Sequence, residues 1–191
     1  DDNGTGRWML NYGVELGCSL SMLSSALNTR FISKLKSERN ELNKNIKRSS
    51  LKYKVDINSL KNAYNFCRLI NYIQAFCLIN AANKNYNWDI SISKALNVWS
   101  NGSIIKSSLI NDLYSNYSVE NILYGKKIIN DLNESKSDLI NVISLSLKND
   151  ISIPCFNDAL NYFNSISNNS LSTNMIQAQR NFFGSHSIKF K

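Results

Sequence analysis

The segment from Asp56 to Asn85 constrains the fold most, because it contains neither glycine nor proline and repeats its apolar residues regularly. Intervals of three or four residues separate Leu60, Ala63, Cys67, Ile70, Ile73 and Cys77. This is the period of an α-helix with one apolar face. A helix over residues 57–86 would be roughly 45 Å long. Its length predicts the central element of a helical domain.

A similar period recurs between Val119 and Leu147. We therefore expect a second long helix over residues 119–148, with a possible kink at Gly125. Its expected inward residues are Ile122, Leu123, Ile128, Ile129, Leu132, Leu139, Val142 and Ile143. The two long helices could be copies of one helical unit, although their sequences do not match visibly.

Shorter helices are predicted on both sides of these two. Residues 8–17 and 20–40 have helical patterns, and another begins after Asn101-Gly102. Asp89 is expected to cap a helix that ends near Trp99, because a short acceptor side chain satisfies first-turn N–H groups. Pro154 is suited to a helix start, so we expect a helix over 155–167 and a last one over about 171–180.

Composition argues against a sheet. The 191 residues include only seven glycines and one proline, too few for many short strands or for a Gly-rich phosphate loop. No alternating run exceeds residues 52–55. With 43% hydrophobic residues, the chain can bury one sizeable core. The predicted fold class is all-α.

The four cysteines form no C-x-x-C pair, and the chain has one histidine, so we expect no metal site. We expect each cysteine to behave as a small buried hydrophobe. No run of about 18 apolar residues and no signal-peptide pattern occurs. We therefore expect a cytoplasmic protein without a membrane partner. The first residue is not methionine, and we interpret the chain as cut from a longer one.

The net charge is +8, and basic residues concentrate between positions 34 and 54. That stretch carries Lys34, Lys36, Arg39, Lys44, Lys47, Arg48, Lys52 and Lys54 against Glu38 and Glu41. Such a run is usually a solvated helix end and loop. The alternative is a basic helical surface that binds nucleic acid, although we expect no nucleic-acid partner.

Four segments could carry chemistry. Asn3–Trp8 has two glycines around the Thr5 hydroxyl, which suits an anion, or forms a flexible turn before a helix. Arg30 lies in an apolar stretch, where it must pair, extend its charge to solvent, or contact a ligand. The segment 99–106 is expected to be a turn whose residues pack.

The fourth segment is Gln177–His186, which holds Arg180 and the only histidine. Both side chains can make charge-assisted hydrogen bonds to phosphate or carboxylate. The segment resembles half of an anion site.

These segments resemble, in order and approximate spacing, the C-terminal helical domain of 6-phosphogluconate dehydrogenase. The matching pieces are Gly4-Thr5-Gly6-Arg7-Trp8, Arg30 with Ser33-Lys34-Leu35-Lys36-Ser37-Glu38-Arg39, Asn71-Tyr72-Ile73-Gln74-Ala75-Phe76, the segment 99–106, Ile153-Pro154-Cys155-Phe156 and Gln177–His186. The resemblance covers nearly the whole chain, and the terminal run is the most specific part.

The resemblance implies a part of the enzyme that oxidatively decarboxylates 6-phosphogluconate to ribulose 5-phosphate and carbon dioxide in the pentose phosphate pathway, with NADP as hydride acceptor. It implies that Thr5 and Arg30 contact the substrate phosphate within one subunit. It implies that Arg180 and His186 reach the neighbouring subunit of a homodimer. Residues 1–175 would form the substrate-binding and dimerisation domain, and residues 176–191 the segment that crosses to the partner.

The resemblance also implies that the family's lysine base, its glutamate acid and its dinucleotide-binding domain precede Asp1. No catalytic residue is therefore expected in this chain, and the isolated chain is expected to be inactive. The chain departs from the family at Asn3, where a lysine is usual, and within residues 100–106. These departures leave a second hypothesis open, in which the site has decayed and the domain is a dimerisation scaffold.

Overall fold

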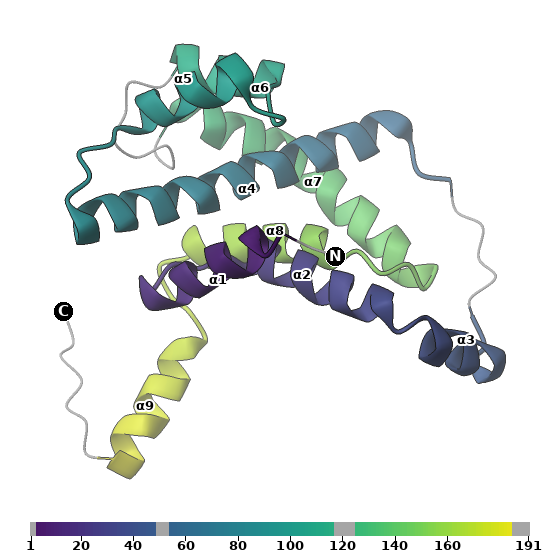
Figure 1. Ribbon diagram of the computed structural model, residues 1–191. Coiled ribbons are helices and arrows are strands. Elements are labelled where there is room, and N and C mark those ends of the chain that lie inside the picture. Colours follow the sequence, from purple (N-terminus) through teal and green to yellow (C-terminus); the bar gives the residue numbers. More distant parts are fainter. Residues whose placement is uncertain (1–2, 49–53, 117–124, 185–191) are drawn as a thin grey trace.

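The computed structural model describes residues 3–48, 54–116 and 125–184, and within these ranges the secondary structure is helical without any strand. The all-α prediction is confirmed. Figure 1 shows the helices as labelled here. They are α1 (Thr5–Glu15), α2 (Ser21–Lys34), α3 (Lys36–Asn45), α4 (Ile57–Tyr86), α5 (Ile92–Gly102), α6 (Ser108–Asn116), α7 (Lys126–Lys148), α8 (Pro154–Ile166) and α9 (Thr173–Gly184).

Helix α4 is the centre of the core, and its bounds agree with the predicted 57–86. The Asp56 carboxylate caps its start by accepting a hydrogen bond of 2.9 Å from the Ser59 N–H. Asn87, in the left-handed conformation at φ 53°, ends it. Its buried side chains are Ala63, Phe66, Cys67, Leu69, Ile70, Tyr72, Ile73, Gln74, Phe76 and Ala82. They cover more than one face, so neighbouring helices enclose the middle of α4.

Two groups of helices pack around α4. In Figure 1, α7 crosses α4, and α5 and α6 lie together beside them. On the other side, α2 packs against α8 and α1 packs against α2, while α8 also contacts α4 and α7. Neither α3 nor α9 buries a residue. Both extend away from the core in the same view.

The second long helix starts later than expected. Residues 117–124 lie outside the described part of the chain, and α7 begins at Lys126. Gly125 is not a kink. It is the N-cap of α7, with an extended backbone at φ −65° and ψ 117°. From Lys126 onward the helix is confirmed, and Ile128, Leu132, Leu139, Val142 and Ile143 are buried as predicted. Ile129 is exposed.

Other predicted boundaries were wrong as well. The helix expected over residues 8–17 runs from Thr5 to Glu15, and the one expected over about 171–180 runs from Thr173 to Gly184. The helix expected over residues 20–40 is divided at Leu35, whose ψ of 58° is not helical. Asp89 does not cap α5, because Ser91 accepts the capping bond of 3.2 Å from the Lys94 N–H. Helix α5 continues past Trp99 to Gly102. Pro154 begins α8 as predicted, since its missing N–H costs nothing there.

The cysteines are all free thiols, and Cys67 is the buried one. Burial, with Cys155 nearby, raises the pKa of Cys67 to about 12. The other three are half-buried. In the described ranges, no cluster of histidine, cysteine and carboxylate side chains could hold a metal ion. None of the described helices has the length and apolarity needed to cross a membrane.

The central position of α4 predicts the stability of two matched variants. Ile70 is completely buried, whereas Ile57 at the start of the same helix is 79% exposed. Ile70→Ala should lower the free energy of unfolding by about 2–5 kcal/mol, because it leaves a cavity in the core. Ile57→Ala should change it by less than about 0.5 kcal/mol. Urea denaturation followed by circular dichroism compares them, and equal losses would contradict a core centred on α4.

Candidate functional site

A pocket of about 220 Å³ lies where the start of α1 meets α2. Its lining residues are Asn3, Gly4, Thr5, Gly6, Arg7, Leu27 and Arg30. Thr5 and Arg30, which are 25 positions apart in the sequence, therefore face the same cavity. The structure thus brings together the two residues that the sequence analysis assigned to one subunit.

The position of Thr5 depends on the backbone of Gly4. Gly4 is the N-cap of α1 at φ 73° and ψ −8°, a left-handed conformation that residues with a side chain rarely adopt. The Trp8 N–H donates to the Gly4 carbonyl at 3.0 Å, which closes the first helical turn. Thr5 is consequently the first residue of α1. The first-turn N–H groups of a helix have no partner within it and attract anions.

Gly6 allows α1 and α2 to approach closely. A Cβ atom at Gly6 would lie 3.1 Å from Cδ2 of Leu27, which is closer than such contacts normally come. Leu27 and Arg30 are three residues apart on α2 and so lie on the same side of that helix. The small residue on α1 therefore lets α2 carry Arg30 to the pocket.

Gln74 on α4 fixes the start of α2. Its Oε1 accepts a hydrogen bond of 3.3 Å from the Met22 N–H, and its Nε2 donates to Ser21 Oγ at 3.0 Å. The N-cap of α2, Leu20, has no side-chain acceptor, so the buried Gln74 serves as a cap from another helix. The sequence analysis missed this role. The signal was present, because Gln74 is an amide within an otherwise apolar stretch.

Arg30 is exposed, and its guanidinium makes neither a hydrogen bond nor an ion pair with any residue in the described ranges. The alternative in which Arg30 is a structural ion-pair partner has no support there. A guanidinium in this position can donate two parallel hydrogen bonds to a phosphate or carboxylate.

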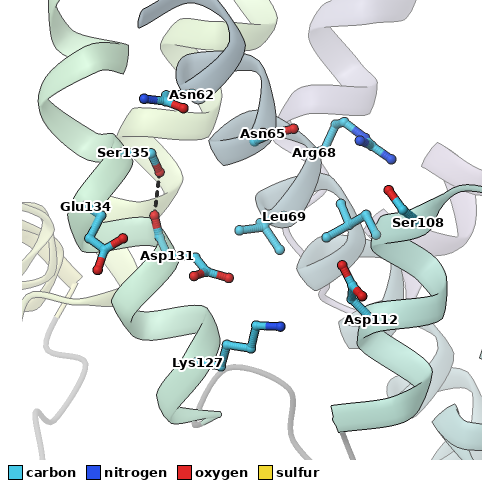
Figure 2. Close-up of a pocket in the computed structure, with 11 residues that line it drawn as sticks. Asn62, Asn65, Arg68, Leu69, Ser108, Asp112, Lys127, Asp131, Glu134 and Ser135 are labelled. Carbon is cyan, nitrogen blue, oxygen red and sulfur yellow. Dashed lines mark hydrogen bonds between the residues drawn. The ribbon is translucent and has the colours of Figure 1, made fainter. Parts of the chain in front are cut away.

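The charges of the pocket favour an anion. Among the residues that the structure describes, its lining contains two arginines, Arg7 and Arg30, and no acidic residue. A second pocket of about 370 Å³ lies between α4, α6 and α7 and differs in this respect. Figure 2 shows Lys127 and Asp131 on one side of it and Asp112 on the other.

Carboxylates outnumber cations in this second pocket. Its charged lining residues are Arg68, Asp112, Lys127, Asp131 and Glu134. The Arg68 guanidinium already donates to Ser107 Oγ at 2.8 Å. Three carboxylates would repel a phosphate dianion. The pocket beside α1 is therefore the better anion site.

The other two predicted site residues are placed differently. Arg180 is exposed on α9 and does not line the pocket of Thr5 and Arg30. His186 lies outside the described residues. Helix α9 extends away from α8 in Figure 1. Its apolar side chains are exposed, with Phe182 at 84% and Phe183 at 77%.

Two further sequence interpretations concern packing and solvation. The ring of Trp99 stacks on Phe76 at 5.6 Å between centroids, so the expected packing role of the segment 99–106 is confirmed for Trp99. It is wrong for Ile104 and Ile105, which are exposed, and the segment is helical up to Gly102 rather than a turn throughout. Residues 34–48 are all exposed, which fits a solvated basic surface. Nucleic-acid binding there stays a hypothesis.

Comparison with known proteins identifies the family. The sequence model described as 6-phosphogluconate dehydrogenase, C-terminal domain, matches residues 1–191. This chain belongs to that family. The decarboxylating 6-phosphogluconate dehydrogenase of Citrobacter freundii is 30% identical over 196 residues, covering 98% of this chain and 44% of the relative. The enzyme of that name from Escherichia coli K12 is 30% identical, covering 98% and 42%.

A solved structure has the same fold. The 6-phosphogluconate dehydrogenase of Plasmodium falciparum, studied in its apo form and in complex with NADP+ and with 6-phosphogluconate, superposes with a TM-score of 0.91 at 26% identity. The match covers 100% of this chain and 43% of that one. The chain thus spans less than half the length of these family members.

Two glycine substitutions test the start of α1. Gly4→Ala should lower the free energy of unfolding by about 1–2 kcal/mol, because it forces a side chain into the left-handed conformation. Gly102→Ala is the control, since Gly102 ends α5 without a positive φ, and an added Cβ would meet no atom within 4 Å other than its chain neighbours and the backbone of its own helix. Chemical denaturation measures both. Equal effects would contradict the strained cap at Gly4.

Proposed function

We propose that this chain is the helical, substrate-binding part of an NADP-dependent enzyme that converts 6-phosphogluconate to ribulose 5-phosphate and carbon dioxide in the cytoplasm. Support comes from the family membership and above all from one observation, that Thr5 and Arg30 line a cavity to which the described residues contribute no acidic side chain. The Thr5 hydroxyl and the Arg30 guanidinium both donate hydrogen bonds to the substrate phosphate. Holding the phosphate orients the rest of the substrate for reaction.

The dinucleotide lies mainly outside this chain in our proposal. A dinucleotide fingerprint needs a strand followed by a Gly-rich turn and a helix, and the described residues contain no strand. They do not fit the pyrophosphate of NADP. NADP supplies hydride acceptance when it is bound, and this chain's own contribution is to bind and orient the substrate.

Arg180 and His186 complete the phosphate site of a neighbouring subunit in this proposal, with residues 1–175 as the main domain and 176–191 as the crossing segment. Helix α9 starts at Thr173, buries no residue within its own chain and exposes Met175, Ile176, Phe182 and Phe183. An exposed apolar cluster on a separate helix is typical of an interface. A homodimer gives this surface a partner and gives each site its second pair of donors.

The phosphate role of Arg30 predicts a change in substrate affinity. In the protein that combines this chain with its dinucleotide-binding domain, Arg30→Gln should raise the KM for 6-phosphogluconate roughly ten- to a hundredfold. Arg39→Gln on α3 is the matched control, because it removes the same charge from an exposed residue outside the pocket. Steady-state kinetics separates them, and equal KM values would contradict the proposed site.

Mixing two impaired variants tests the shared site. An Arg30→Gln dimer and an Arg180→Gln dimer should each have impaired sites. A mixed dimer should contain one site with both arginines intact, so random subunit exchange should restore about a quarter of the sites. NADPH formation after mixing measures the recovery. Absence of recovery in confirmed mixed dimers would contradict the crossing of α9.

The same assay separates this proposal from a catalytically silent scaffold. A complete protein that dimerises but produces no NADPH from 6-phosphogluconate would favour the scaffold.

A further inference from the structure

We propose that Arg7 on α1 is a second cation, beside Arg30, that this chain supplies to its own substrate-phosphate site, and that it strengthens the preference of this pocket for a doubly charged phosphate. This inference rests on the proposed function and deepens it. The pocket lining contains two guanidinium groups, and only that of Arg30 has been given a role so far.

The charge of the ligand requires more than one cation. A phosphate monoester carries about −1.5 to −2 at neutral pH, and within one subunit, before the proposed Arg180 and His186 of a neighbouring subunit are counted, Arg30 supplies a single positive charge. The remaining polar side chains of the lining, Asn3 and Thr5, are neutral. Within the described part of the chain, Arg7 is the one additional charged side chain that lines the cavity. Together the two arginines match the charge of the dianion within one subunit, and the proposed Arg180 and His186 of a neighbouring subunit add further donors.

The position of Arg7 in α1 supports this role. Arg7 is the third residue of the helix, and helical side chains tilt toward the N-terminus, which is the end that forms the pocket. A cation in a first turn opposes the helix dipole, and α1 has no acidic residue in that turn. A bound anion makes this arrangement favourable, because both the helix end and Arg7 attract the anion.

Asn3 provides a direct way to test charge rather than shape. Asn3 precedes Gly4 in the sequence and lines the same cavity. A lysine at position 3 would return one positive charge to the pocket after Arg7 has lost its own. A loss of thermal stability, which a purely structural role of Arg7 in α1 would produce, would not be recovered by this change.

The experiment compares five forms of the protein that contains both this chain and its dinucleotide-binding domain. They are the unchanged protein, Arg7→Gln, Arg7→Lys, Arg7→Gln with Asn3→Lys, and Arg39→Gln. The measurements are kcat, the KM for 6-phosphogluconate and the inhibition constant of inorganic phosphate. Thermal melting checks that each variant is folded.

Arg7→Gln should raise both the KM and the phosphate inhibition constant about tenfold or more, with little change in kcat. Adding Asn3→Lys should recover much of this loss, Arg7→Lys should have an intermediate effect, and Arg39→Gln should have none. Unchanged constants in folded Arg7→Gln, with Arg30→Gln still defective, would overturn this inference and leave the proposed function intact.

The other outcomes are equally decisive. A loss that Asn3→Lys does not recover would overturn the role in charge matching. If Arg7→Gln does not fold, Arg7→Lys decides, since a raised KM at unchanged kcat supports the proposal and an unchanged KM overturns it. Failure of the unchanged protein to use 6-phosphogluconate would reject the proposed function itself, together with this inference.

Discussion

The burial of α4 on more than one face is the constraint on which the rest of the structure depends. Its apolar side chains remove the middle of the helix from water only if α7, α8 and α5 pack around it. Because α8 contacts both α4 and α2, this packing also places α2. Gln74 then fixes the start of α2 through two hydrogen bonds. The core thereby positions Arg30.

The anion pocket combines three elementary effects at one point. A left-handed glycine begins α1 beside α2, Gly6 allows the two helices to approach, and the described residues of the lining include arginines but no carboxylate. None of these alone defines a site, since helix ends and exposed arginines are common. Because they coincide in one cavity, a phosphate group there can meet backbone N–H donors, a hydroxyl and positive charge together.

Sequence analysis predicted the elements better than their ends. The period of α4 was clear because a long, uninterrupted apolar face is required of a central helix. The division at Leu35 was missed because no glycine or proline marks it. Asp89 resembled a cap, but the chain turns there at a positive φ of 53° and leaves capping to Ser91. The side chains of Asp89 and Ser91 can both cap a helix, and in the folded chain Ser91 caps α5.

The site residues were predicted from motif resemblance, but their geometry could not be predicted from the sequence. The meeting of Thr5 with Arg30 depends on the approach of α1 to α2, which no local pattern reveals. Arg7 was noticed only as part of a motif, because an arginine in a first turn is equally compatible with solvent. The role of α9 is even harder to predict from the sequence, because its apolar face has no partner within the described part of one chain.

A crystal structure of the protein with bound 6-phosphogluconate tests the central claim most directly. We expect the phosphate in the pocket at the start of α1, with its oxygens within hydrogen-bond distance of the Thr5 hydroxyl and the Arg30 guanidinium. A phosphate located elsewhere, such as in the pocket between α4, α6 and α7, would contradict the account.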